Sequence, residues 1–320
     1  MSNNLIVSSS PHLHSGARTR KIMLDVIIAL APAAIAAVVF FGIKALLLIA
    51  VTTAAAVLSE FLFNVITKKQ QTVGDLSAIV TGLLLALTLP ATTHLWQAVV
   101  GAVFAIVVVK CLFGGIGCNF ANPAIAARVM MLISFTNTVA GGTNTTFADE
   151  PLKAGATPLA NLGKADAVLP SLTDMLIGNR GGAIGETCAI ALLIGFVYLL
   201  VKKVISWHTP VVFVASTFVL SFLFGGFDIT ASLYHVLGGG LLIGAIFMAT
   251  DYVTSPITKW GKVIFAFGCA LFTVIIRVFG SLPEGVSYAI LLMNILSTPI
   301  EILTAPKALG AIKAKKGGKE

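Results

Sequence analysis

Long apolar runs separated by short polar stretches dominate the sequence, and they predict a helical membrane protein. A helix that crosses a bilayer needs about twenty residues, and by that criterion we expect about ten spans. They lie at residues 22–42, 45–66, 76–89, 94–113, 123–139, 183–204, 208–224, 233–250, 260–280 and 286–304. Several runs are short, notably 76–89, which ends at Pro90, so some helices are expected to be broken or re-entrant.

The composition supports the same fold class. Of the 320 residues, 57% are hydrophobic and only 11% are charged, and the mean hydropathy is +0.98. Soluble proteins carry about a quarter charged residues. Arg18, Arg20 and Lys21 precede an apolar run longer than the core of a cleavable signal peptide, so we interpret that run as the first span. The expected fold is an all-α integral membrane protein.

One long polar segment, residues 140–182, divides the predicted spans into five before it and five after it. We therefore expect a tail at 1–20, a first membrane half at 21–139, the polar loop, a second half at 183–304 and a basic tail at 305–320. Gly82-Leu83-Leu84 precedes Pro123, and Gly240-Leu241-Leu242 precedes Pro283 at a similar distance. Unless this match is chance, it indicates two inverted five-helix repeats, as in many transporters.

Basic residues indicate the orientation. One set of predicted span ends holds Arg18, Arg20, Lys21, Lys68, Lys69, Lys202, Lys203, Lys259, Lys262 and the lysines of the 307–319 tail. Because positive residues favour the cytoplasmic side, both termini are expected in the cytoplasm and the 140–182 loop outside. The same placement explains the net charge of +8 without nucleic acid. Cys111, Cys118, Cys188 and Cys269 are scattered, with no spacing that predicts a metal site.

The polar loop contains the first candidate site. Residues 155–160 read Gly-Ala-Thr-Pro-Leu-Ala, and glycine and proline beside Thr157 favour an exposed turn that presents its hydroxyl. From these residues alone, Thr157 is more simply a turn residue.

Further candidates flank the predicted spans. Asn122 can cap a helix that Pro123 begins, and the free N–H groups there suit an anionic ligand; Asn119 precedes it, and a plain helix cap is the alternative. Arg128 lies inside a predicted span and needs a partner, either Glu60 or a ligand phosphate. Asn179 and Arg180 form a flexible basic turn ahead of Glu186, at the start of the next helix.

Residues 155–160 resemble the flavin-attachment motif of a family of membrane flavoproteins, which comprises the D subunits of Rnf complexes and the B subunits of sodium-pumping NADH:quinone reductases. Similar blocks follow in the same order at 178–180, 185–187, 248–256 and 283–285 with Met293-Asn294, so the resemblance runs from Ser10 to about Glu301. Two departures stand out: Ala154 replaces a usual Ser or Thr, and the nearest acids, Asp149 and Glu150, lie far upstream.

The resemblance implies an Rnf-type subunit in a prokaryotic inner membrane, with FMN esterified to Thr157 through its phosphate. It also implies flavin contacts from Gly155, Ala156, Asn119, Asn122, Arg128, Asn179, Arg180 and Glu186, and it leaves room for riboflavin as a second flavin. Electrons passing between ferredoxin and NAD would be coupled to Na⁺ or H⁺ movement. The chain itself shows no catalytic constellation on which a small substrate would react.

The implied partners are the other Rnf subunits: a second flavoprotein, iron–sulfur membrane subunits and a cytoplasmic NADH-binding subunit. Membrane lipid would surround the chain, and no nucleic acid is expected. Two alternatives remain at this point. One is the quinone reductase subunit, which the short N-terminal tail disfavours, and the other is a flavin-free protein of transporter type.

Overall fold

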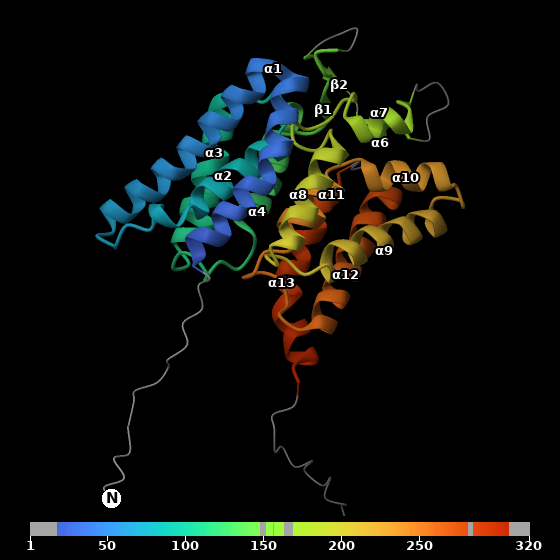
Figure 1. The fold of residues 1–320 in the computed structure, drawn as a ribbon. Helices are drawn as coiled ribbons and strands as arrows, with labels where there is room; N and C mark the ends of the chain where they lie inside the picture. Colours follow the sequence, from blue (N-terminus) through green and yellow to red (C-terminus); the bar gives the residue numbers. More distant parts are fainter. Residues whose placement is uncertain (1–17, 148–151, 156, 163–168, 281–283, 307–320) are drawn as a thin grey trace, which may run out of the picture.

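The computed structural model describes residues 18–147, 152–155, 157–162, 169–280 and 284–306. Nearly all secondary structure in these residues is helical, as the sequence predicts (Figure 1). The elements of the first half are α1 (Thr19–Ile66), the short η1 (Val73–Asp75), α2 (Ser77–Thr88), α3 (Leu95–Val103), the π-helix η2 (Phe104–Cys111), α4 (Pro123–Ser134) and α5 (Thr136–Val139). Those of the second half are α8 (Ala189–Val201), α9 (His208–Phe224), α10 (Ile229–Leu237), α11 (Leu241–Ile243), the π-helix η3 (Gly244–Met248), α12 (Lys259–Phe279) and α13 (Val286–Thr304).

The first long helix is two helices joined at a glycine. Inside α1, Gly42 has φ 65° and ψ −150°, a conformation that glycine adopts far more easily than other residues. The chain turns there, so that α1 forms the two arms seen at the top of Figure 1. The break coincides with the boundary predicted between the spans 22–42 and 45–66.

Several helices are short or bent, as the short apolar runs predict. Helix α2 has 12 residues, and α10 meets the helix formed by α11 and η3 at an angle of 58°. In the described part of the chain, three helices are long and apolar enough to cross a membrane unaided, or four if that bent pair is one span. The remaining apolar helices are shorter than a full bilayer crossing.

The two halves pack through small residues. α1 contacts α2, α3 and α8, while α9 and α12 form the centre of the second half. At Gly195 of α8, a Cβ atom would clash with the carbonyl oxygen of Ala29 in α1, so these two helices touch backbone to backbone. Such close approach is typical of helix packing in membranes. No hydrophobic driving force holds helices together there, and small residues let their backbones come close enough for van der Waals packing.

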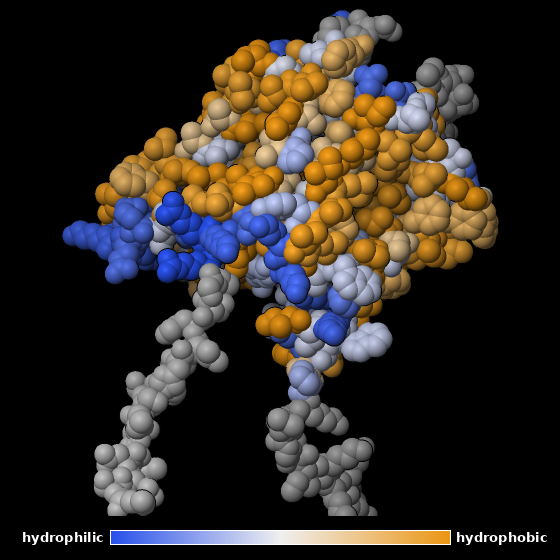
Figure 2. All heavy atoms as spheres, viewed as in Figure 1, coloured by the Kyte–Doolittle hydropathy of each residue, from blue (hydrophilic) through white to orange (hydrophobic). Residues whose placement is uncertain are grey.

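The two faces of the molecule differ. The polar loop, with strands β1 (Gly142–Thr143) and β2 (Ala154–Gly155) and helices α6 (Pro158–Asn161) and α7 (Leu172–Ile177), lies at one end, and the start of α1 and the end of α13 lie at the other (Figure 1). Apolar side chains cover the middle, and hydrophilic residues gather along the lower edge (Figure 2). Exposed Lys68, Lys69, Lys202 and Lys203 follow α1 and α8.

The glycines matched in the predicted repeat occupy different structural positions. Gly82 lies inside α2, whereas Gly240 precedes α11 in a left-handed conformation with φ 69°. The residue that corresponds to Gly240 in conformation is Leu76, which precedes α2 with φ 67°. The Gly-Leu-Leu triplets of the two halves are therefore not structurally equivalent. The same triplet lies inside a helix in one half and at a helix start in the other, because it is suited to both positions. The inverted repeat itself stays a prediction.

Candidate functional site

Thr157 begins the short helix α6. Its hydroxyl accepts a hydrogen bond from the amide of Ala160 at 3.4 Å, and Pro158 occupies the first helical position, where its fixed φ favours a helix start. The side chain is only 1% exposed. The prediction of an exposed turn is therefore wrong, because proline after a capping threonine starts a helix that the rest of the protein covers.

A three-glycine turn, Gly238–Gly240, packs against this helix. Gly239 and Gly240 have φ values of 62° and 69°, and a Cβ on Gly239 would lie 2.6 Å from Cδ1 of Leu159. The same Cβ would lie 2.5 Å from Nη2 of Arg277. Only glycine permits Leu159 and Arg277 to approach the backbone this closely. The turn therefore links the helix that follows Thr157 to a charged cluster on its other side.

Arg180 is buried and ties the loop to two helices. Its Nε donates to the carbonyl of Thr187 at 3.2 Å, and its Nη2 donates to the carbonyls of Glu186 at 2.6 Å and Leu237 at 2.7 Å. Nη1 is buried without a hydrogen-bond partner among the described residues. Burial lowers the pKa of this guanidinium, and nearby Glu186 opposes that effect. The basic turn at Asn179 and Arg180, which the sequence predicts to be flexible, is thus held in place, because three carbonyls bind its arginine.

The remaining loop candidates lie around this arginine. Asn179 is exposed, and its side-chain oxygen accepts a hydrogen bond from the hydroxyl of Thr145 at 3.0 Å. Gly155 pairs with Gly142 between β1 and β2. Ala156, predicted to contact the flavin, lies outside the described residues.

Arg128 pairs with Glu284. Its Nη2 lies 2.6 Å from Oε2 of Glu284, and its Nη1 donates to the carbonyl of Val139 at 3.3 Å. The predicted partner Glu60 is wrong, because Glu60 lies on the second arm of α1 and pairs with Lys110 instead. Burial raises the pKa of Glu284, and the charge of Arg128 lowers it in part.

Glu186 faces the same region as this pair. Its Oε1 accepts a hydrogen bond from the amide of Ala183 at 3.1 Å, and its Oε2 would lie 3.0 Å from a Cβ on Gly240. Arg277 donates to the carbonyls of His235 at 2.5 Å and Gly239 at 3.0 Å. The sequence reasoning missed Arg277 and the charge of Glu284. An arginine within the apolar run 260–280 was an available signal, because a charge in a span needs a partner.

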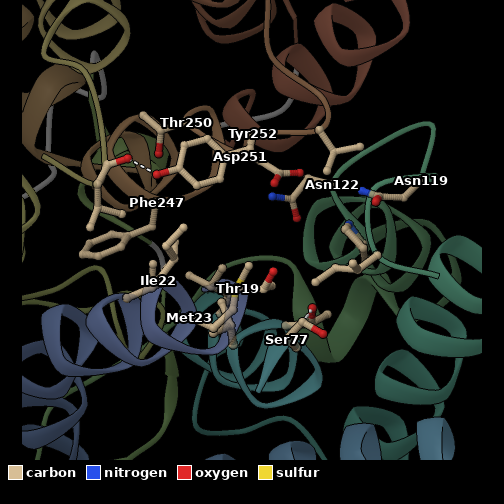
Figure 3. A pocket seen from close by; sticks show the side chains of 18 of the residues that line it. Thr19, Ile22, Met23, Ser77, Asn119, Asn122, Phe247, Thr250, Asp251 and Tyr252 are labelled. Carbon is tan, nitrogen blue, oxygen red and sulfur yellow. Dashed lines mark hydrogen bonds between the residues drawn. The ribbon is translucent and has the colours of Figure 1, made fainter. Parts of the chain in front are cut away.

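A second site lies at the end of the molecule near the start of α1. It is a cavity of about 260 Å³, bounded by α1, α2, η2, the loop before α4 and the segment after η3. Figure 3 shows Asn119, Asn122, Asp251 and Thr250 along one side and Thr19 and Met23 along the other. Most of the remaining lining is apolar, including Ile22, Val26, Val80, Leu84 and Phe247.

Asn122 caps α4 as predicted. Its Oδ1 accepts from the amides of Ala124 at 3.0 Å and Ile125 at 3.3 Å, and its Nδ2 donates to the carbonyl of Met248 at 3.3 Å. Asn119 donates to the carbonyl of Ala121 at 3.0 Å. Burial raises the pKa of Asp251, although the hydroxyl of Thr254 and two amides stabilise its charged form.

Lys110 and Ser77 line this cavity, and Lys110 forms a buried ion pair with Glu60 behind it. Nζ of Lys110 lies 2.9 Å from Oε1 of Glu60 and 2.5 Å from Oγ of Ser77. The hydroxyl of Thr72 donates to the same Glu60 oxygen at 2.6 Å. Lys110 is not among the residues predicted from the sequence, although a lysine inside the predicted span 94–113 indicates a buried charge that needs a partner.

The predicted site residues therefore fall into two groups. Thr157, Asn179, Arg180, Glu186 and Arg128 lie around the loop and the three-glycine turn, whereas Asn119 and Asn122 line the cavity near the start of α1. Within the described ranges, no cluster of three His, Cys, Asp or Glu side chains could hold a metal ion.

Fold and sites together define an all-helical integral membrane protein with a folded polar loop on one face and, toward the other, a mainly apolar cavity with a few polar residues. The chain belongs to the NQR2, RnfD, RnfE family, whose sequence model matches residues 6–310.

Similar proteins cover almost the whole chain. It is 45% identical over 322 residues to the D subunit of the Na(+)-translocating ferredoxin:NAD(+) oxidoreductase complex of Acetobacterium woodii, an alignment that covers 99% of this chain and 98% of that protein. It is 38% identical over 323 residues to the D subunit of the proton-translocating ferredoxin:NAD(+) oxidoreductase complex of Clostridium ljungdahlii, with coverage of 96% and 97%. The D subunit of the ion-translocating oxidoreductase complex of Stutzerimonas stutzeri is 36% identical over 324 residues, with coverage of 91% and 92%.

Proposed function

We propose that this chain is the D subunit of an Rnf-type complex, which passes electrons between ferredoxin and NAD and moves Na⁺ or H⁺ across the prokaryotic inner membrane. The observation that carries the proposal is the similarity of the chain, over nearly its full length, to proteins with this name. Those relatives are named for sodium in one case and for protons in another, so family membership leaves both ions open. The partners are the other subunits, which supply the NADH-binding, iron–sulfur and second flavoprotein components.

In this proposal, FMN is esterified to Thr157 through its phosphate. The residues around Thr157 fit such a group in charge, because Arg180 Nη1 and Arg277 Nε are buried donors without partners in the described part of the chain. Flavin bound here would supply one- and two-electron chemistry that side chains lack. Arg180 and Arg277 would hold its phosphate, and the surrounding residues would cover its ring and exclude water.

Attachment requires Thr157 to turn outward. The cost is modest, because α6 has only four residues and the hydroxyl makes one long hydrogen bond. The described residues of the loop include one aromatic, Phe147, which is exposed. The flat ring would therefore pack against the helix ends around the three-glycine turn, where the charge of Glu186 would tune its potential.

We propose the 260 Å³ cavity as the site of the second flavin, riboflavin. Its isoalloxazine ring has an apolar edge and a polar edge, and the cavity offers both kinds of surface. Asn122, Asp251 and Asn119 lie where the polar edge would bind, and Val80, Leu84 and Phe247 lie where the apolar edge would pack. The two flavins would then occupy opposite faces of the protein, with the loop outside and both termini in the cytoplasm.

Fluorescence on a denaturing gel tests the covalent flavin. Wild type stays fluorescent, because a phosphoester survives unfolding whereas bound flavin washes out, and peptide mass mapping places the added FMN mass on the peptide that contains Thr157. Thr157→Ala abolishes the band. Thr146→Ala, which alters an exposed loop threonine bonded to the carbonyl of Phe40, is the matched control and keeps it. A fluorescent Thr157→Ala band would contradict the attachment site.

Mass mapping excludes or supports the first alternative, and an activity assay of the purified complex decides the second. A flavin-free transporter would show no added mass on any peptide. The NADH:quinone reductase subunit would carry the flavin too, but the purified complex would then reduce quinone with NADH rather than exchange electrons between ferredoxin and NAD.

A further inference from the structure

A second, much smaller cavity lies beneath the three-glycine turn. Its volume is about 20 Å³, and its polar lining comes from Thr88, Arg128, Glu186, Glu284 and Ser287, with Gly239 and Gly240 above them. A cavity of this size holds about one water molecule. The two carboxylates come from different helix starts, Glu186 ahead of α8 and Glu284 ahead of α13.

The carboxylates leave hydrogen-bonding capacity unused. Glu284 gives one oxygen to Arg128, and its other oxygen, Oε1, is buried without a partner among the described residues. Glu186 gives Oε1 to the amide of Ala183, while its Oε2 faces Gly240. A buried acceptor without a partner is unfavourable. A water in the cavity, or a proton on one carboxylate, removes that cost.

The surrounding charges explain why a proton suits this site better than a metal cation. Arg128 of α4 contacts Glu284 directly, Arg277 of α12 interacts electrostatically with both carboxylates, and Arg180 neighbours Glu186. Tyr288 of α13 also interacts electrostatically with Glu284. Guanidinium groups on several sides repel Na⁺ and also oppose proton binding, but burial of Glu284 and the nearby charge of Glu186 favour its neutral form.

We propose that the unpaired Oε1 of Glu284 binds one exchangeable proton, with a water in the cavity connecting it to Glu186. Filling the site transfers a proton from a solvent hydronium ion to a carboxylate oxygen: an O–H bond forms on the glutamate, the hydronium becomes water, and no electrons move. Emptying the site reverses these steps. Arg128 keeps its ion pair throughout, because it contacts Oε2 of Glu284 and leaves Oε1 available.

The position of the site suggests its role. The three-glycine turn contacts the helix that follows Thr157 on one side and Glu186 on the other. Negative charge added near Thr157 would raise the proton affinity of this pair, since an anion close to a carboxylate favours its neutral form. This coupling rests on the proposed flavin at Thr157, whereas proton binding by the pair does not.

Infrared spectroscopy of the purified complex across a pH titration tests proton binding directly. A protonated glutamate has a carbonyl stretch separate from that of the carboxylate, and we expect one such band to titrate. In Glu186→Gln, removal of the neighbouring carboxylate lowers the proton affinity of Glu284 about tenfold. In Glu284→Gln the carboxyl group that binds the proton is absent, so the band is lost. Glu60→Gln, the buried carboxylate beside Lys110, is the control and leaves the band unchanged.

The Thr157→Ala background separates this proposal from the flavin proposal. The band persists there if the glutamates bind the proton by themselves, whatever the flavin content. If Glu284→Gln fails to assemble, the double variant Arg128→Gln with Glu284→Gln removes both charges of the ion pair and gives the same readout. The proposal is overturned if no band titrates in the wild type. It is also overturned if the band is the same in the wild type, Glu186→Gln and the Glu284 variants. A band lost only in Glu60→Gln overturns it as well.

Discussion

Arg128 and Glu284, which are 156 positions apart, form an ion pair whose nitrogen and oxygen lie 2.6 Å apart. The pair connects α4 of the first half to the start of α13 in the second. Its arginine is one of the largest fully buried side chains in the described part of the protein. A buried pair of this kind joins elements that are distant in the sequence, and removal of either partner leaves an unpaired buried charge.

We predict that Arg128→Ala destabilises the protein by about 3–5 kcal/mol, because it leaves Glu284 buried without its partner. Arg128→Met combined with Glu284→Gln should recover much of that loss. Thermal unfolding of the detergent-purified chain measures both. The fluorescent band expected from the proposed flavin at Thr157 should remain in Arg128→Ala. If the single and double variants are equally unstable, the pair does not act as a unit.

Gly195→Ala should weaken the contact between the two halves. The added Cβ clashes with the carbonyl of Ala29, and overpacking of this kind costs about 1–3 kcal/mol. Gly74→Ala is the matched control, because no atom lies within 4 Å of its Cβ position, and its effect should stay within about 0.5 kcal/mol. Thermal unfolding of the two variants compares them. Equal stability would show that α8 and α1 can separate at this point without cost.

The proposed orientation can be tested with a thiol reagent that does not cross membranes. Cys118 is exposed, and its neighbours Gly117 and Asn119 line the 260 Å³ cavity, on the same side as the start of α1. In intact cells it should stay unlabelled, whereas in inverted vesicles it should react. Phe147→Cys, in the exposed part of the loop, should show the opposite pattern in a background in which Cys118 is serine. Labelling of Cys118 in intact cells would reverse the orientation.

Asp251, which lines the 260 Å³ cavity, should make the free energy of unfolding of the protein depend on pH. Burial raises its pKa above the ordinary value of 3.8, so the folded protein binds this proton more tightly than the unfolded chain. The stability contributed by the group is therefore highest at low pH. It falls as pH rises from the unfolded pKa to the folded one, and it stays low above that. Asp251→Asn should remove this slope from a plot of unfolding temperature against pH. An unchanged slope would show that another group is responsible.

Hydropathy predicted the fold class and most helix positions, because a bilayer-crossing helix requires a run of apolar residues whatever its neighbours. Local rules also predicted the Asn122 cap and the break near Gly42, since both depend only on adjacent residues. Thr157 shows the limit of such rules. The neighbours of Thr157 favour a turn, but the contact of Leu159 with Gly238–Gly240, 79 or more positions away, buries the helix it begins.

The charged residues show the same limit. The position of Arg128 within an apolar run predicts that it is buried, but which residue pairs with it depends on how helices from the two halves pack. Glu60 and Glu284 were both available in the sequence, and only the packing of α4 against α13 decides between them. Lys110 and Arg277 were visible within apolar runs, and a search for charges inside each run would have identified both.

The end of α2 has a consequence for how the protein is made. The carbonyls of Leu87 and Leu89 accept hydrogen bonds from the amides of Gly185 and Ile184, at 2.8 and 3.0 Å. While a ribosome is still translating the polar loop, those amides do not yet exist, and the surface of α1 that meets Gly195 is uncovered. The nascent first half must therefore wait beside the insertion machinery with polar groups unsatisfied. A chain that stalls within the loop therefore leaves the Leu87 and Leu89 carbonyls without these partners and this surface of α1 uncovered.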